Sequence, residues 1–508
     1  MPHDLSNFGV NANFRVAPNV LGSNPQLKSA SKQSIQTDPN VESVGTTSVL
    51  YDLMATKWPL IEDLWGGTST MRAAERLWLP IEPKENEDMY SNRLHRSILF
   101  NAFRATIDRL VSKPFSHAIT IEKISGPKKL LAIEDDVDGT GKNLTQFSRE
   151  LFESGLKYGL SHILVDFTKI SDKVETKADE DSIGTRPFFI NVDPTQLIFW
   201  DIQEHPITKI PTLNEIRIRE LTVEKLGKFS NKLIETIRVF KQDTWEVWTF
   251  NTDSKVYERT DNGVNSLGMI PLVTFYVRRT GALTGTPPFE DLAWLNLAHW
   301  QSYSDQRNIL RFARTGILFG PGFGEDEISG VAWGPNTFVK STDPEAKLMT
   351  VEYKGTGIKA GAEDLKTLED QMELMGLQPF FERTANSTAT GKMIDESKTI
   401  NDIQAWIRSL ENTLHNAYDF GSKWLGGEDL EDLQLDIFND FSISSQGTKD
   451  LQSLLQMAKD KVISVRALLT EIKRRGVLSE AFDIDEELNE RSAEESHNTD
   501  ELVIANVG

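Results

Sequence analysis

The chain has 508 residues, of which 39% are hydrophobic and 26% are charged. These are ordinary values for a globular protein, and at about 150 residues per domain the length predicts two to four domains. The chain has no cysteine, which excludes disulfides, thiolate zinc sites and thiol catalysis. No apolar run approaches the length of a membrane-spanning helix. The N-terminus has neither the basic nor the apolar segment of a secretory leader, so we expect a cytosolic chain with no membrane partner.

The charge balance is acidic, with 55 basic and 76 acidic residues and a net charge of −21. A protein that binds nucleic acid tightly is normally basic, because lysine and arginine neutralise the phosphates. The chain is therefore expected to repel DNA over most of its surface. DNA remains possible as a partner only at local basic sites.

The first half of the chain predicts a flexible arm followed by one α+β domain. Residues 1–45 are rich in Asn, Ser, Gln and Pro and have no apolar period. From 46 to about 285, helical spacing gives way to short alternating runs typical of antiparallel strands. The elements expected there are a helix over 49–66 interrupted by Pro59, a helix over 92–111, a strand over 117–123, a helix over 144–158, a buried strand over 162–167, and several strands between 186 and 280.

The second half is mainly helical, with short strands between the helices. A helix is expected to begin after Pro287–Pro288, and an exposed loop is expected where Pro, Thr, Ser, Asn and Gly leave little to bury. The tail beyond Glu480 is acidic. The expected elements are a helix over 290–314, short strands, a helix over 361–376, the loop over 379–392, a helix over 393–424, a strand over 433–441, and helices over 448–461 and 464–475.

Motifs for chemistry are incomplete wherever they occur. GTGK at 139–142 resembles a phosphate-binding loop, but Asp136 and Asn143 replace the glycine and hydroxyl residues that such a loop needs. The same stretch resembles the start of a calcium loop, but Thr145 stands where a bidentate glutamate belongs. His162 lies inside an apolar strand and is read as a core residue. The sequence therefore predicts no catalytic, cofactor-binding or metal-binding residue, and a scaffold rather than an enzyme.

Several segments, in this order, resemble one branch of the tailed-bacteriophage portal proteins, a branch long catalogued as a family of unknown function. The resemblance covers about 46–490, and the co-linear order of the pieces makes it specific. One departure is Gly391, where an acidic residue is commoner. The segments are LWGGTSTMRAAERLWLP with Tyr90, Arg93 and Arg96 downstream, VDGTGKNLTQFSRELFESGLKYGLSHILVDF, DLAWLNLAHWQSYSDQRNILRFARTGILFG, STATGKMIDES and LLTEIKRRGVL.

The resemblance implies a structural role in a virion without a cofactor. Portal proteins form a ring, usually of twelve subunits, at one vertex of the capsid. They are assembled in the host bacterial cytoplasm with the major capsid protein and scaffold. The ring docks the terminase large subunit, passes double-stranded DNA through its channel, and later binds head–tail adaptor or tail proteins. The acidic balance agrees with a channel in which DNA must slide.

The portal fold has an α+β wing, a two-helix stem, a small α/β clip, a long channel-to-crown helix and a helical C-terminal crown. The resemblance maps these parts by their order along the chain. The implied parts are the arm over 1–45, the wing over 46–288, the first stem helix over 289–313, the clip over 314–360, the second stem helix over 361–378, the channel loop over 379–392, the long helix and a wing strand over 393–447, and the crown with its acidic tail over 448–508.

Three sets of residues are candidates for function within this scheme. The first set would line the channel and touch phosphates weakly, the second would hold the stem together by charge within or between subunits, and the third is the apolar seam of the long helix. The seam is either core or subunit interface, and the resemblance favours at least partial burial in the interface. The sets are Arg383, Thr384, Ser387, Thr388, Thr390 and Lys392 for the channel; Arg307, Arg311 and Arg314 against the acidic stripe Glu363, Asp364, Glu369, Asp370 and Glu373 for the stem; and Ile403, Ile407, Leu410 and Leu414 for the seam.

Two other classes of protein stay open on the sequence. Another phage connector or a tail-hub protein shares the composition but should lack the helix–insert–helix arrangement over 289–378. A DNA-processing enzyme, either a nuclease or a motor, would need clustered carboxylates or a complete phosphate-binding loop. The acidic residues over 480–501 offer such a cluster, although a charge run is usually a solvated surface.

Overall fold

The computed structural model mixes helices with antiparallel sheets, which confirms the α+β class, and it divides into two compact units, Met1–Ile437 and Phe438–Gly508. The arm over 1–45 and the acidic tail lie mostly outside the residues that the structure describes. These residues are 43–124, 126–168, 185–204, 207, 209–315, 317–319, 321–323, 341–347, 349–351, 355–376, 389–439, 444–474, 478 and 482–489.

The first unit opens with a series of short helices. Pro59 lies in the first turn of α4, where a missing N–H costs nothing, so the expected interruption within 49–66 is confirmed. Ser48 caps α3 by accepting a hydrogen bond from the backbone N–H of Tyr51. The helices are α3 (Val49–Ala55), α4 (Trp58–Trp65), α5 (Thr68–Ala73), η2 (Glu75–Leu77), α6 (Glu87–Arg96) and α7 (Ala102–Ser112).

The single helix predicted over 92–111 is wrong, because the structure has α6 and α7 there with an extended link between them. Asn101 lies in this link and caps α7, accepting a hydrogen bond from the backbone N–H of Arg104. Its side-chain amide also donates to the carbonyl of Leu64 at 2.7 Å. The apolar period continues across the capping residue Asn101, and for this reason it predicts one helix where the structure has two.

A three-stranded antiparallel sheet forms the centre of the first unit, with β2 (Leu160–Phe167) between β3 (Pro187–Val192) and β9 (Leu272–Tyr276). Helix α9 (Leu144–Tyr158) packs on this sheet and has the predicted bounds. Both of its ends carry local signals: Asn143 caps the first turn, and Gly159 closes the last turn at φ 91. A Cβ at Gly159 would lie 2.2 Å from the carbonyl oxygen of Thr286, so no other residue fits there.

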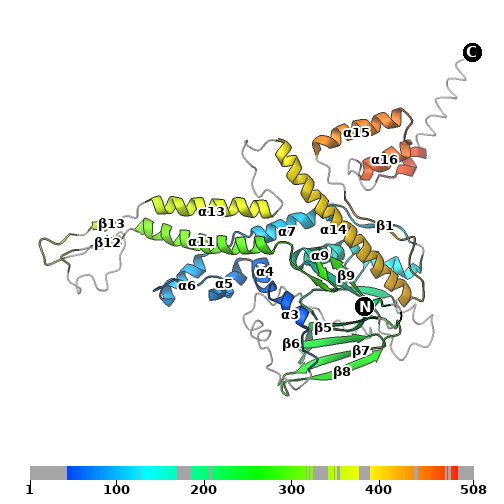
Figure 1. Cartoon of the computed structure of the whole chain (residues 1–508), viewed down its shortest axis with the longest axis horizontal. Coiled ribbons are helices and arrows are strands. Elements are labelled where there is room, and N and C mark those ends of the chain that lie inside the picture. The colour runs from blue at the N-terminus through cyan, green and yellow to red at the C-terminus, as the bar shows by residue number, and fades with distance from the viewer. Residues whose placement is uncertain are drawn as a thin grey trace, which may run out of the picture. The chain divides into compact units, whose positions relative to one another are not determined.

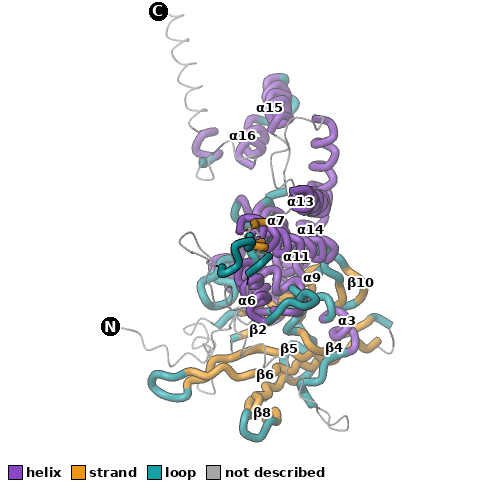
Figure 2. The backbone as a smooth tube through the Cα atoms, turned by 90° about the vertical axis from the view of Figure 1, so that its left-hand side faces the viewer, coloured by secondary structure: helices purple, strands orange, loops and turns teal. Residues whose placement is uncertain are grey.

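A five-stranded antiparallel sheet adds its strands in chain order, and Figure 2 shows them together at the end of the first unit away from α13. Arg238 of β6, which is only partly exposed, ties the two sheets by ion pairs to Asp166 of β2 and Glu220 of β5, each at 3.1 Å. The strands are β4 (Leu197–Glu204), β5 (Pro211–Lys225), β6 (Asn231–Lys241), β7 (Thr244–Asn251) and β8 (Val256–Val264).

Three longer helices follow, with one small strand pair among them (Figure 1). Helix α11 (Glu290–Thr315) leads to β12 (Ile317–Phe319), which pairs with β13 (Met349–Val351), and α13 (Gly355–Met375) packs beside α11. Helix α13 begins at Gly355 rather than at 361, so 355–360, placed in the clip by the sequence, are helical. Helix α14 (Ala389–Trp424) is the longest.

The remaining short elements complete the first unit. Strand β14, in the segment predicted as a strand over 433–441, pairs with β1 from the segment 117–123, although the two are far apart in sequence. The elements are η3 (Pro114–Ser116), β1 (Thr120–Lys123), η4 (Lys128–Leu130), α8 (Ala132–Asp135), β10 (Arg279–Gly281), β11 (Thr284–Gly285) and β14 (Gln434–Asp436).

The apolar seam of α14 is core of the chain itself. Ile403, Ile407, Leu410 and Leu414 are all 0% exposed, and α14 packs on β9, β2 and β3. The expectation that this seam contributes to a subunit interface is therefore wrong for these four side chains. The period of three and four revealed an apolar stripe, but it carried no information about which surface covers the stripe.

The second unit is a small helical group. Helices α15 (Ser444–Lys459) and α16 (Val465–Arg474) correspond to the two predicted helices with slightly shifted ends. Leu468 of α16 is buried, and the Lys473 ammonium group donates to the carbonyl of Phe482 at 2.9 Å.

Candidate functional site

The first part of α11 is anchored firmly in the core of the first unit. Asn296 is fully buried and satisfies two backbone groups at the start of α7: its oxygen accepts from the N–H of Phe103, and its amide donates to the carbonyl of Phe100. The Lys57 ammonium group forms an ion pair with Glu290 at 2.7 Å. These contacts fix the position and the rotation of α11 about its axis.

The second part of α11 and the whole of α13 extend from this anchor as an antiparallel pair (Figure 1). Most residues of α13 are exposed or partly exposed, and α11 becomes exposed on several sides beyond Gln306. The strand pair β12–β13 lies at the far end of the two helices. The pair is therefore a projection that its own chain covers only in part.

Polar contacts hold the two helices together. The Nε2 atom of His299 lies 3.3 Å from Glu369, the Ser302 hydroxyl donates to Asp364 at 2.6 Å, and the Gln306 amide donates to the carbonyl of Ile358 at 2.8 Å. Burial lowers the pKa of His299, although Glu369 acts in the opposite direction. The contacts therefore set an antiparallel register in which His299 faces Glu369.

At Gly361 the side of α13 lies directly against the side chain of Gln306 on α11. A Cβ there would lie 2.1 Å from Oε1 of Gln306. A glycine inside a helix costs about 1 kcal/mol relative to alanine, so its place in α13 is explained by this contact. A substitution would have to displace Gln306 from the carbonyl of Ile358.

Two carboxylates of the predicted acidic stripe, Asp364 and Glu369, contact α11, and their partners there are Ser302 and His299. Arg307, Arg311 and Arg314 are exposed, as are Glu363 and Asp370, whereas Glu373 is buried. The helix period explains this, because His299, Ser302 and Gln306 use the face of α11 directed at α13, and the three arginines lie well to the side of that face. Their pairing between subunits remains a prediction.

Helix α6 lies on the other side of α11 from α13, and a buried ion pair holds it there. Arg93 is 3% exposed and contacts Glu85 at 2.8 Å, the carbonyl of Pro80 at 2.7 Å and Asp305 of α11 at 3.7 Å. The hydrogen bonds from Arg93 hold the pKa of Glu85 below its ordinary value. Arg93 therefore joins α6 and the loop before it to α11.

Two arginines meet at the outer edge of α6 and α11. Arg96 and Arg311 line a shallow cavity of about 200 Å³ together with Met89 and Asn308. Partial burial, and then the charge of Arg311, lower the pKa of Arg96. Glu82 and Lys84 also line this cavity, so the edge carries both signs with the two arginines side by side.

The predicted channel loop lies largely outside the residues that the structure describes. This holds for Arg383, Thr384, Ser387 and Thr388. Helix α14 begins at Ala389, so Thr390 and Lys392 belong to its first turn rather than to a loop, and the loop boundary at 392 is wrong. Residues 389–391 are Ala, Thr and Gly, which carry no apolar period, so the sequence does not predict that the helix begins at Ala389.

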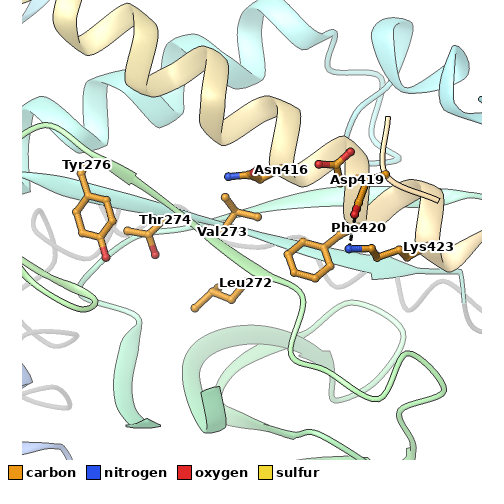
Figure 3. A pocket seen from close by; sticks show the side chains of 9 residues that line it. Leu272, Val273, Thr274, Tyr276, Asn416, Asp419, Phe420 and Lys423 are labelled. Carbon is orange, nitrogen blue, oxygen red and sulfur yellow. Dashed lines mark ion pairs between the residues drawn. The ribbon is translucent and has the colours of Figure 1, made fainter. Parts of the chain in front are cut away.

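A second concave region lies between β9 and the end of α14, with a volume of about 520 Å³ (Figure 3). Its charged groups are already engaged: Lys423 pairs with Asp429 at 2.7 Å, and Asp419 accepts from the backbone N–H of Leu430 at 2.8 Å. Sequence reasoning missed this region, since its walls come from segments far apart in the chain.

The incomplete motifs have structural roles in the described part of the chain. Arg186 pairs with Asp136, and Lys142 pairs with Asp138 and Glu150, so the side chains of the GTGK stretch tie a turn together. His162 is buried beside the Thr274 hydroxyl, and burial lowers its pKa to about 3, which confirms a neutral core histidine. Among the described residues no group of three or more His, Asp or Glu is placed to hold a metal.

No helix within the described ranges is both long enough and apolar enough to cross a bilayer.

Comparison with known proteins places a family match on the helix pair. Residues 288–425 match a family described as a domain of unknown function (DUF4055). No curated protein matches the chain. The matched stretch contains α11, β12, β13, α13 and α14, and it leaves out both larger sheets.

Solved structures of phage-like particles are similar to the chain at low identity. A chain described as part of the neck of a native gene transfer agent (GTA) particle computed with C12 symmetry is 9% identical, with 73% of this chain and 89% of that chain covered and a TM-score of 0.37. A chain from the virion of a native GTA particle is 9% identical, with 72% and 88% covered and a TM-score of 0.36. A chain from the neck of an empty GTA particle computed with C6 symmetry has the same identity and coverage, with a TM-score of 0.37.

Proposed function

We propose that the chain is the subunit of a portal ring at one vertex of a phage-like capsid, through which double-stranded DNA passes. The observation that carries the proposal is the continuous stretch 288–425. It combines an antiparallel helix pair, a small strand pair at the far end of that pair, and a long helix, and it matches a single family. The tail-hub alternative is expected to lack this arrangement.

The projection of α11 and α13 supports assembly into a ring. A helix pair that is exposed on several sides gains little burial from its own chain, and helical stability in proteins comes mainly from packing. In a closed ring, each copy covers its neighbour through two different surfaces. The partial exposure of α11 and α13 is therefore what a ring subunit needs before it assembles.

The acidic charge supports a channel rather than a tight DNA-binding surface. The chain carries a net charge of −21, and many copies around one axis would repel a duplex from the channel wall instead of holding it. We propose no catalytic role for the chain. In this scheme the terminase large subunit supplies the motor, and capsid, scaffold and head–tail adaptor proteins bind the outside of the ring in the virion.

Electron microscopy of the purified full-length chain tests the proposal. We expect negatively stained rings with a central hole wide enough for a DNA duplex, and a particle mass that is an integer multiple of the subunit mass. A protein that stays monomeric at micromolar concentration would contradict it. Rings whose hole is too narrow for a duplex would favour a connector or tail-hub protein without a DNA channel.

A further inference from the structure

Strand β9 lies at one edge of the three-stranded sheet, and part of its backbone points away from that sheet. The N–H of Val165 on β2 donates to the carbonyl of Pro271, so the register directs the odd-numbered residues of β9 toward β2. The backbone N–H and C=O groups of Leu272, Thr274 and Tyr276 therefore point outward. These residues line the concave region of about 520 Å³ between β9 and α14, called the β9 groove below (Figure 3).

Most of these outward groups have no partner among the residues that the structure describes. The N–H of Leu272 donates to the carbonyl of Ile270, and the carbonyl of Tyr276 accepts from the Ser409 hydroxyl at 2.9 Å. No described residue bonds the carbonyl of Leu272, the N–H of Tyr276 or either backbone group of Thr274. Backbone groups in a strand need hydrogen-bond partners, and an edge of this kind is a template for a further strand.

The groove offers backbone hydrogen bonds and apolar surface rather than free charge. Strand β9 reads Leu-Val-Thr-Phe-Tyr, without the charged residue or proline that commonly protects an edge from strand pairing. The charged groups lie on the other side of the groove and are engaged: Lys423 pairs with Asp429, and Asp419 accepts from the N–H of Leu430. This is the chemistry of a site that takes an extended peptide as an added strand.

One stretch of the N-terminal arm has the sequence pattern of such a strand. The arm as a whole has no apolar period, but residues 8–16 alternate strictly between apolar and other residues, and Pro18 follows them. Strict alternation that ends before a proline is typical of a half-buried strand. The apolar members are Phe8, Val10, Ala12, Phe14 and Val16.

Charge and reach favour this stretch over other segments outside the described ranges. Residues 8–16 carry a single charge, Arg15, whereas 169–184 contain eight charged residues and the apolar run 502–505 does not alternate. Val16 precedes Ser43 by 27 residues, and an extended segment of that length spans about 90 Å. The arm can therefore reach β9 of its own chain, and the tether gives it an effective concentration on the order of millimolar.

We propose that residues 8–16 of the chain's own N-terminal arm bind in the β9 groove as a strand added to the outward edge of β9. The backbone of the arm pairs with Leu272, Thr274 and Tyr276, and its alternating side chains contact the walls of the groove. The added strand closes an edge at which another chain could otherwise pair. The inference concerns one copy of the chain and does not depend on the proposed ring.

Cross-linking tests the contact, and the chain has no cysteine of its own to interfere. One variant carries Asn13→Cys with Asn416→Cys, because Asn416 is exposed on the α14 wall of the groove. The matched control carries Asn13→Cys with Asn401→Cys, which is exposed on the same helix about 22 Å away. We expect a short bifunctional maleimide to join the first pair at least about tenfold more than the second.

Mass spectrometry of a mixture of isotope-labelled and unlabelled protein shows whether the cross-link joins one chain or two. Cross-links within one chain support the inference. Equal yields from the two cysteine pairs, or cross-links that join only different copies, would overturn it.

Amide hydrogen exchange gives a second measurement that leaves the groove unchanged. A variant with Ala12→Pro and Phe14→Pro loses backbone donors that the added strand needs, so the peptide over 272–276 should exchange at least about tenfold faster. The control with Gln26→Pro and Lys28→Pro alters the arm outside 8–16 and should exchange as the unchanged chain does. Thermal melts verify that both variants are folded, and equal exchange in the two variants would contradict strand addition.

Discussion

Arg93 shows how one residue can position a whole element. Its guanidinium group is buried between Glu85, the carbonyl of Pro80 and Asp305. Buried ion pairs stabilise little relative to apolar residues, but removing one partner leaves an unpaired charge in a poorly solvated place. The pair therefore fixes where α6 lies on α11, which in turn sets the edge that carries Arg96.

We expect Arg93→Ala to lower the free energy of unfolding by about 3–5 kcal/mol, because Glu85 stays buried without its partner. The matched control is Arg104→Ala. The Arg104–Asp108 pair is about half exposed on both sides, and such pairs contribute at most about 1 kcal/mol. Denaturant unfolding measures both variants, and equal losses would contradict the buried role of Arg93.

At the scale of the element, α14 acts as the cover of the central sheet. Its apolar stripe is buried against β9, β2 and β3, and Trp424 at its end donates a hydrogen bond to the carbonyl of Val165 on β2. The opposite side of the helix is polar and exposed, with Asn401, Arg408 and Asn412. Any contact between copies made by this part of α14 would have to use that polar side.

We expect Ile407→Asp to abolish the cooperative unfolding transition of the chain. The side chain is 0% exposed inside its own subunit, and a buried charge without a partner is costly. Asn412→Asp, on the exposed side of the same helix, should leave thermal stability within about 0.5 kcal/mol of the unchanged chain. Soluble, folded monomers from Ile407→Asp would show instead that this residue contacts another copy.

Local signals in the sequence predicted some elements well. The bounds of α9 follow from Asn143 and Gly159, which cap it from within the chain itself. The break between α6 and α7 has one local signal, Asn101, which caps α7. The extended link is also held by Asn101 donating to the carbonyl of Leu64 and by the Ser97 hydroxyl donating to Ser304 of α11, and the sequence does not reveal these contacts. The side chains through which α11 and α13 meet could not be predicted, since the partner of a helix face depends on tertiary packing.

At the scale of the whole molecule, nearly all of the described core belongs to the first unit. Of the buried apolar residues that the structure describes, Leu468 alone comes from the second unit. The segment after α14 nevertheless belongs to the first core: Leu430, Leu433 and Ile437 are buried, and β14 pairs with β1. The boundary that matters for folding therefore lies after this segment and not at the end of the long helix.

Two truncations test that boundary. A chain that ends at Asn439 keeps β14 and its three apolar neighbours, and we expect its melting temperature to stay within about 2 °C of the full chain, since a change below about 1 kcal/mol shifts a large domain by no more than that. A chain that ends at Trp424 exposes the surfaces that Leu430, Leu433 and Ile437 cover. Burying each such side chain contributes about 1.5–3 kcal/mol, so we expect a fall of about 10 °C or an insoluble product. Equal melting temperatures for the two truncated chains would show that the segment after α14 contributes nothing to the core, and the pairing of β1 with β14 would then have no role in the stability of the first unit.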